Sequence, residues 1–251
     1  MAQQKGILQL KGTVGNITFY KSKDGYLARE KGGIDAKRFA TDPAFQRTRE
    51  NGQEFGRAGK ASKYLRNAVR SLSQNASDSK MVSRLTRQMM QVVQSDPINA
   101  RGMRNVTNGD ITLLQDFDFN LNSKLGTTLY APFTAEINRV TGSLIAEIPA
   151  FVPASMVAAP GGATHFKLHS AGVETDFVQG TNVADVKSSD TIALDNVATT
   201  LLTHSHEVTP NSTHPLFILL GIEFFQEVNG SMYPLKNGAF NALAIVKASG
   251  V

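Results

Sequence analysis

The residues best suited to metal or acid–base chemistry are the histidines, and all five lie in the second half of the chain. His204 and His206 alternate along one segment, and His165 and His169 stand four residues apart. In an extended strand, each pair would lie on one face. Three imidazoles and a water form a common zinc site, but nothing in the spacing brings the two pairs together. We therefore expect strand histidines that face solvent or join a polar network, and no bound metal.

The carboxylates and short motifs give equally little support for catalysis. Asp116 and Asp118 would share a strand face, with Asp110 upstream, and such carboxylates can serve glycosidases or bind calcium. The string is short and lacks EF-hand spacing, which favours surface aspartates. The chain has no cysteine, so thiolate nucleophiles and disulfides are excluded, and it has no P-loop, dinucleotide fingerprint or Gly-x-Ser-x-Gly elbow. We expect a protein that is not an enzyme and needs no cofactor.

Basic side chains are the third chemically distinctive group. Residues 1–106 carry 20 Lys and Arg against 8 Asp and Glu, a net charge of +12, whereas residues 107–251 carry 6 against 13, a net of −7. This polarity suits either nucleic acid or head-to-tail docking on the acidic half of another copy. A solvated basic surface without a partner is a third interpretation. The candidate contacts for a polyanion or acidic partner are Arg47, Arg49, Arg57, Lys60, Lys63, Arg66, Arg70, Arg84 and Arg87.

Three segments would position these residues, and the first, residues 1–34, is predicted to be a β-hairpin arm. Gly15-Asn16 and Asp24-Gly25 are turn signals between β-branched and aromatic residues. A small meander is marginal in water by itself, so the arm must pack on its own chain or on another copy. Its predicted contact residues are Ile7, Leu10, Ile17, Phe19, Tyr20, Tyr26 and Leu27.

The second segment, residues 35–106, is predicted to be a basic helical region. Asp42 and Pro43 are typical of a helix start. An apolar stripe at three- to four-residue spacing runs from Phe55 to Leu72, and a second lies within residues 79–94. We expect these two helices to form an antiparallel hairpin with a basic outer surface.

The third segment, residues 107–251, is predicted to be an antiparallel β-sandwich of jelly-roll or immunoglobulin-like layout, which makes the whole chain an α+β protein. Short apolar runs alternate with turn signals, of which Asn229-Gly230 is the clearest. The predicted strands are 111–114, 117–121, 134–140, 143–148, 165–170, 191–194, 199–204, 216–228, 231–235 and 239–247.

Residues 5–72 contain the pattern FYK…GYLAR…KGG…DPAFQRTREN, which runs from Phe19 to Asn51. It resembles an uncharacterised family of Bacteroidota proteins. The resemblance implies a bacterial source, but it implies no activity and no functional residues, and it does not extend into the β-rich half.

Together these features predict a non-enzymatic structural protein that self-assembles into a filament, tube or shell, with copies of itself as head-to-tail partners. The alternative is a nucleic-acid-binding or capsid-like coat protein that uses the basic helical face, and a carbohydrate-binding module is a third candidate. The N-terminus lacks a signal-peptide pattern and no apolar run reaches about 20 residues, so we expect cytoplasmic synthesis and no membrane span. An extracellular or particle-associated final location stays open.

Overall fold

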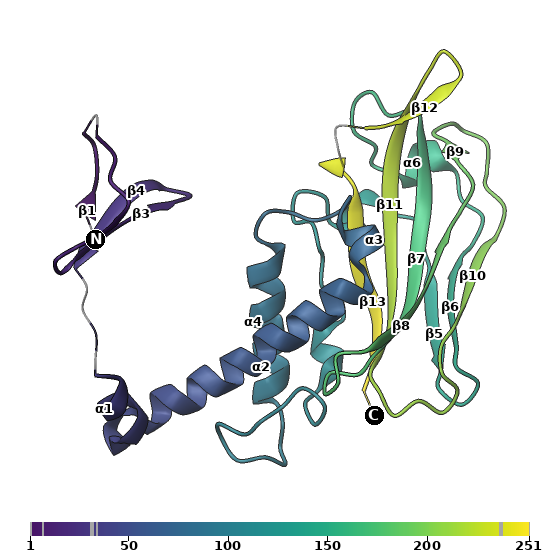
Figure 1. The fold of residues 1–251 in the computed structure, drawn as a ribbon. Helices are drawn as coiled ribbons and strands as arrows, with labels where there is room; N and C mark the ends of the chain where they lie inside the picture. Colours follow the sequence, from purple (N-terminus) through teal and green to yellow (C-terminus); the bar gives the residue numbers. More distant parts are fainter. Residues whose placement is uncertain (1, 7, 31–32, 34, 236–237, 251) are drawn as a thin grey trace. The chain divides into compact units, whose positions relative to one another are not determined.

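The computed structural model describes residues 2–6, 8–30, 33, 35–235 and 238–250. It contains both helices and sheets of antiparallel strands, which confirms the mixed class predicted from the sequence (Figure 1). The chain divides into two compact units, residues 1–49 and residues 50–251. This boundary falls inside the predicted helical region.

The first unit is built on a four-stranded antiparallel sheet with the strand order β1-β4-β3-β2. Both predicted turns are confirmed, because Gly15-Asn16 joins β2 to β3 and Asp24-Gly25 joins β3 to β4. Gly15 and Gly25 have φ angles of 56° and 106°, which glycine adopts without steric cost. β1 pairs with β4 on the side away from β3, and this strand was not predicted from the sequence. The four strands are β1 (Ala2–Gln3), β2 (Gly12–Val14), β3 (Ile17–Ser22) and β4 (Gly25–Glu30).

A short helical stretch completes the first unit. It comprises α1 (Ala36–Thr41), the 3-10 turn η1 (Pro43–Phe45) and the first turn of α2 (Gln46–Ala68). Asp42 accepts a hydrogen bond from the Ala44 N–H at 2.9 Å, which confirms its predicted capping role. The segment that it caps is a 3-10 turn instead of an α-helix. The Arg49 guanidinium donates to the carbonyls of Phe39 and Asp42 at 2.6 and 2.9 Å and so ties α1 to the start of α2.

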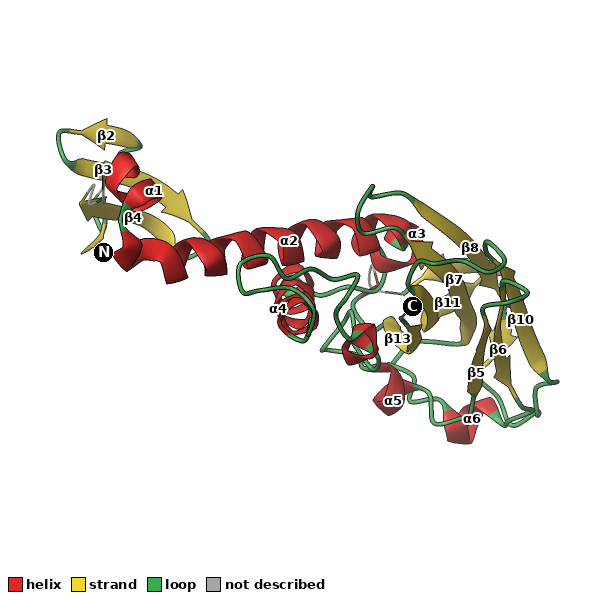
Figure 2. Ribbon diagram, turned by 90° about the horizontal axis from the view of Figure 1, so that it is seen from below, coloured by secondary structure: helices red, strands yellow, loops and turns green. Residues whose placement is uncertain are grey.

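Three helices form a layer in the second unit: α2 from residue 50 onward, α3 (Arg70–Ser73) and α4 (Met81–Gln94). Most of the two predicted apolar stripes is buried, but Phe55 is 59% exposed, so the stripe of α2 begins at Ala58. Figures 1 and 2 show that α4 crosses α2 steeply, and Thr86 Oγ1 lies 3.3 Å from Ser62 Oγ between them. The predicted antiparallel hairpin is therefore wrong. Both stripes face a common sheet instead of lying along each other.

Two antiparallel sheets make up the rest of the second unit. The smaller sheet has the order β10-β6-β5. In the larger, six-stranded sheet, β11 pairs with β7 on one side, and on the other side with β13 along its first half and β12 along its second. β7 in turn pairs with β8 and β9. The strands are β5 (Thr134–Asn138), β6 (Ser143–Ile148), β7 (His165–Thr175), β8 (Asn182–Ser188), β9 (Ile192–Ala193), β10 (Leu202–Glu207), β11 (Leu216–Val228), β12 (Ser231–Pro234) and β13 (Ala242–Ser249).

The six-stranded sheet is covered on both faces. Phe217 and Leu219 of β11 pack in a cluster with residues of α2 and α4. The alternate residues Leu216 and Ile218 pack in a second cluster with Leu144 and other residues of the three-stranded sheet. Figure 2 shows the helices on one side of this sheet and β5, β6 and β10 on the other. Burial on both faces explains why β11 is a continuous apolar run instead of an alternating one.

The strand predictions are accurate for the long runs and wrong for two short ones. Residues 143–148 and 216–228 match β6 and β11 at both ends, and Asn229-Gly230 makes the β11–β12 turn with φ angles of 51° and 78°. Residues 111–114 instead form the 3-10 turn η2 (Ile111–Leu114), because the Asp110 side chain accepts from the Thr112 N–H and caps it. Two short helices, α5 (Leu125–Thr128) and α6 (Pro153–Met156), and strand β8 were not predicted.

Residues 117–121 form no strand beyond a single bridge between Asp118 and Ala244 of β13. Asp116 just before them has a φ of 63°, which turns the chain out of the extended conformation. Asp118 accepts a hydrogen bond from the Leu125 N–H at 3.0 Å and thereby holds the start of α5. The expected strand face shared by Asp116 and Asp118 does not exist.

Candidate functional site

The arm sheet has two chemically different faces, because residues paired across antiparallel strands share a face. One face, called here the apolar face of the arm, consists of Val14, Ile17, Phe19, Tyr26 and Ala28, with Lys21 and Glu30 at its margins. The other face is more polar and consists of Thr13, Thr18, Tyr20, Leu27 and Arg29. The arm is therefore amphipathic across its thickness.

Nothing within the described part of residues 2–49 is buried. Val14 is 69% exposed and Ile17 is 45% exposed, although both lie on the apolar face of the arm. A stable sheet of this size normally packs one face against another layer, because apolar side chains gain free energy when they leave water. The apolar face of the arm is thus a surface that a partner could cover.

The structure brings together only part of the predicted contact set. Ile17, Phe19 and Tyr26 share the apolar face, whereas Tyr20 and Leu27 lie on the opposite face. Leu10 lies outside the strands, where its backbone N–H donates to the Gln4 side chain at 2.9 Å. Ile7 lies outside the described residues. Side chains alternate between the two faces along each strand, so the pairing of β3 with β4 decides which residues of the two strands share a face.

The predicted basic residues fall into two groups, and in the first the guanidinium groups bind backbone carbonyls of their own unit. In addition to Arg49, Arg57 donates to the carbonyls of Gly102 and Arg104. Arg84 donates to the carbonyls of Asp118 and Phe119 at 2.7 and 3.0 Å and pairs with Asp78. These three arginines hold loops in place, so most of their charge is engaged within the protein.

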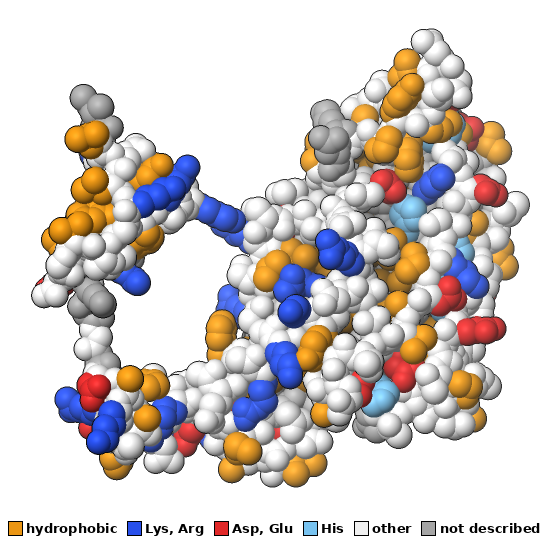
Figure 3. Space-filling model, in the orientation of Figure 1, with side chains coloured by type: hydrophobic (Ala, Val, Ile, Leu, Met, Phe, Trp, Pro, Cys, Tyr) orange, Lys and Arg blue, Asp and Glu red, His pale blue; other side chains and the backbone are white. Residues whose placement is uncertain are grey.

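Most of the second group presents its charge to solvent. Lys60, Lys63 and Arg70 are exposed along α2 and α3, and Arg87 is exposed on α4. Arg66 is half-buried, and Arg47 is exposed in the first unit. On the face of the second unit seen in Figure 3, Lys and Arg side chains gather over the helices and Asp and Glu over the sheets. The basic surface is therefore real, but it holds fewer available charges than the sequence predicts.

The two histidine pairs lie on opposite faces of β7. His165 and His169 face the helical layer, where their ring nitrogens lie 3.8 Å from Glu227 and 3.1 Å from Glu223. His204 and His206 share one face of β10, as predicted, and approach Ser170 on the other side of β7. Among the described residues, no group of three or more His, Asp or Glu is placed to hold a metal ion.

Ser170, His204 and His206 form a polar network between the sheets, in which Ser170 and His206 are buried and His204 is half-buried. Ser170 Oγ lies 2.6 Å from His204 Nδ1 and 2.8 Å from His206 Nε2. His206 Nδ1 lies 3.5 Å from Asp185 Oδ2, so a serine, an imidazole and a carboxylate follow in the order used by hydrolases. Ser170 and His206 are nevertheless 0% exposed, so no substrate reaches the hydroxyl in this conformation.

The same network disfavours the protonated form of its imidazoles. Burial lowers the pKa of His204, and the nearby positive charge of Lys187 lowers it further. Burial also lowers the pKa of His206, outweighing the opposing effect of Asp185. Gly172 makes room for the ring, because a Cβ there would overlap His206 Cβ and lie 3.0 Å from its Cγ. The network therefore supports the junction between β7, β8 and β10.

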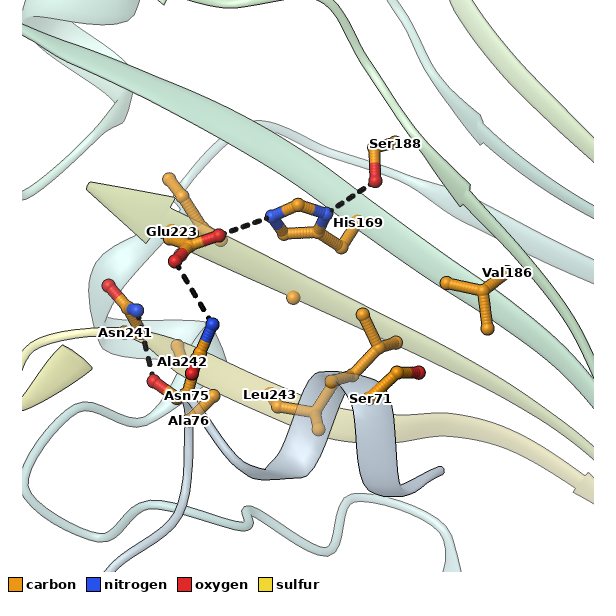
Figure 4. Close-up of a pocket in the computed structure, with 13 residues that line it drawn as sticks. Ser71, Asn75, Ala76, His169, Val186, Ser188, Glu223, Asn241, Ala242 and Leu243 are labelled. Carbon is orange, nitrogen blue, oxygen red and sulfur yellow. Dashed lines mark hydrogen bonds and ion pairs between the residues drawn. The ribbon is translucent and has the colours of Figure 1, made fainter. Parts of the chain in front are cut away.

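On the opposite face of β7, His169 lies at the edge of a cavity of about 230 Å³, called here the His169 pocket (Figure 4). His169 Nδ1 is 2.7 Å from Ser188 Oγ, and its Nε2 is 3.1 Å from Glu223 Oε2. The floor is apolar and includes Leu72, Ala76, Val186, Ala242 and Leu243. The pocket combines an apolar base with a polar rim, which is the usual composition of a small-molecule site.

No helix in the described parts of the chain is long and apolar enough to cross a membrane. Comparison with family models, with curated proteins and with solved structures found no match for this chain.

Proposed function

We propose that this chain is a non-enzymatic structural protein that self-assembles into a filament, tube or shell through its N-terminal arm. The observation that carries the proposal is the uncovered apolar face of the arm, on a sheet without a buried residue among those described. Burying Val14, Ile17 and Phe19 against a second copy would supply about 1.5–3 kcal/mol for each side chain that becomes fully covered.

The charge distribution supports a second copy of the chain as the partner. Residues 1–106 carry a net charge of +12 and residues 107–251 one of −7, so the basic part of one copy attracts the acidic part of another. A contact between two different surfaces of one chain repeats from copy to copy and generates rings or open helical assemblies. β1 and β2 are the two edge strands of this sheet among the described residues, and edge strands offer backbone groups for strand addition.

The test compares two substitutions at adjacent positions of β3. Ile17→Asp places a charge on the apolar face of the arm, and Thr18→Asp places the same charge on the opposite face. We expect wild-type protein and Thr18→Asp to form ordered assemblies by sedimentation velocity and negative-stain microscopy, and Ile17→Asp to remain monomeric. A wild-type protein that stays monomeric at high concentration, or two variants that behave alike, would refute the proposal.

A nucleic-acid-binding or capsid-like function is the second candidate, because Lys60, Lys63 and Arg70 are exposed together along α2 and α3. Binding to phosphates would weaken steeply with salt. Assemblies with a nucleic-acid absorbance ratio, lost in a Lys60→Ala, Lys63→Ala, Arg70→Ala variant, would favour this function. Assemblies free of nucleic acid would exclude it for the purified protein.

We also propose that the two sheets of the second unit form a β-sandwich. Support comes from the shared apolar cluster, in which Leu144 of β6 packs with Leu216 and Ile218 of β11. A jelly-roll or immunoglobulin-like layout is the finer version of this proposal. An experimental structure that places β6 away from β11 would refute it.

A further inference from the structure

The rim of the His169 pocket is a connected chain of hydrogen bonds. Ser188, His169 and Glu223 follow one another as described above, and Glu223 Oε1 then lies 3.4 Å from Asn75 Nδ2. The Asn75 carbonyl accepts from Asn241 Nδ2 at 2.9 Å. Figure 4 shows these groups arranged around the cavity. Because Asn241 is buried and also bound to the Phe224 N–H, the rim is fixed before any ligand arrives.

Glu223 is the carboxylate of this rim, and among the described residues that line the pocket there is no lysine or arginine. Its Oε2 is engaged by His169, but its Oε1 has only the long contact to Asn75. Lys167 lies on the same face of β7, yet its Nζ is placed over the Phe225 ring, 5.6 Å from the centroid. A carboxylate oxygen is thus available to a donor inside the pocket.

The size and floor of the pocket restrict the rest of the ligand. About 230 Å³ lies below the roughly 300–1,000 Å³ of sites for drug-sized ligands, so the occupant is small. Val186 and Leu243, on opposite sides of the cavity, offer apolar contact to a short aliphatic chain. An anionic ligand would face Glu223 without a compensating cation.

We propose that the His169 pocket binds a primary ammonium group carried on a short apolar chain, with the ammonium on Glu223 and the chain on the apolar floor. This chemistry occurs both in free alkylamines and in the lysine side chain of a polypeptide. The proposal does not depend on assembly through the arm, because every residue that lines the pocket belongs to the second unit.

Isothermal titration calorimetry with matched probes tests the proposal on the full chain at neutral pH. We expect pentylammonium to bind, and pentanol and pentanoate to bind about tenfold more weakly or not at all, because a hydrogen bond to a charged group is worth about that factor or more. Equal binding of pentylammonium and pentanol would overturn the proposal.

Two glutamates on one face of β11 provide the variant and its control. Glu223→Gln removes the charge inside the pocket, whereas Glu227→Gln removes a similar charge that faces His165 outside the lining. We expect Glu223→Gln to weaken pentylammonium binding at least about tenfold and Glu227→Gln to leave it unchanged. Equal affinities of the two variants would contradict the assignment, provided that both melt at the wild-type temperature.

A blocked lysine distinguishes the two sources of the ammonium group. Nα-acetyl-lysine amide keeps the free ε-ammonium group of lysine, and its backbone amine and carboxyl groups are blocked. Binding at least as tight as that of pentylammonium would identify a polypeptide lysine as the natural occupant, and exclusion of the blocked lysine would identify a free amine. If neither probe binds, the proposal fails while assembly through the arm is unaffected.

Discussion

The network of Ser170, His204 and His206 makes the second unit sensitive to mild acid. In the folded chain, burial lowers the pKa of both imidazoles below the ordinary value of 6.5, so they take up protons less readily there. In the unfolded chain they take up protons freely. Stability is therefore complete above pH 6.5 and falls as the pH drops below that value, until the folded-state pKa is reached.

The expected size of the effect follows from proton linkage. A histidine that took up no proton at all in the folded state at pH 5.5 would lower stability by about 1.4 kcal/mol relative to high pH, so about 2.8 kcal/mol is the upper limit for the two. Total stabilities are commonly about 5–15 kcal/mol, so the loss is large enough to measure. Carboxylates with ordinary pKa values near 4 contribute little between pH 5.5 and 7.5.

Urea unfolding followed by circular dichroism measures this loss, since the chain has no tryptophan to report by fluorescence. We expect His206→Phe to lower stability at pH 7.5 and to remove about half of the pH dependence between pH 7.5 and 5.5. The control His165→Gln lies outside the network and should keep the full dependence. A wild-type stability that is constant over this range, or an unchanged slope in His206→Phe, would refute the reasoning.

Three further perturbations probe contacts elsewhere in the second unit. Gly172→Ala should cost about 1–3 kcal/mol in urea unfolding, because the new Cβ would overlap His206 Cβ. Although burial alone would raise its pKa, hydrogen bonds from Asn99, Asn105 and Ile98 lower the pKa of Asp96 to about 2. Its contribution of about 2.5 kcal/mol should be present above pH 4 and lost as the pH falls toward 2, and Asp96→Asn should abolish that transition. Arg84→Lys should lower the melting temperature, since lysine cannot serve two carbonyls and Asp78 together, whereas Arg87→Lys should not.

Much of the local structure could be predicted because it depends on neighbouring residues. Gly15, Gly25 and Asn229-Gly230 mark turns by the backbone angles they allow, and all are turns in the structure. The apolar residues at the start of 216–228 mark a strand, and residues 216–222 are buried on both faces. The shared face of His204 and His206 follows from the period of two along a strand.

What could not be predicted depends on partners distant in the sequence. Nothing near Arg57 or Arg84 shows that its donors serve carbonyls about 35–50 residues away, and so both were expected to meet a polyanion. Glu54 is likewise buried through a contact distant in the sequence, because its carboxylate accepts from the Gly102 N–H at 2.8 Å. The crossing of α2 and α4 is likewise set by the sheet beneath them, which their own apolar stripes do not describe.

The two-sided burial of β11 has a consequence for how the chain is made. Residues 216–222 form an uncharged apolar run of the kind that stacks into intermolecular β-structure when exposed. β7 precedes this run by about 50 residues, and β13, which covers its other edge, is translated later. During synthesis, β11 leaves the ribosome before β13, and in that interval one edge of β11 is unpaired. Folding of the second unit therefore has to wait for β13, and the interval before it arrives is the period of greatest aggregation risk.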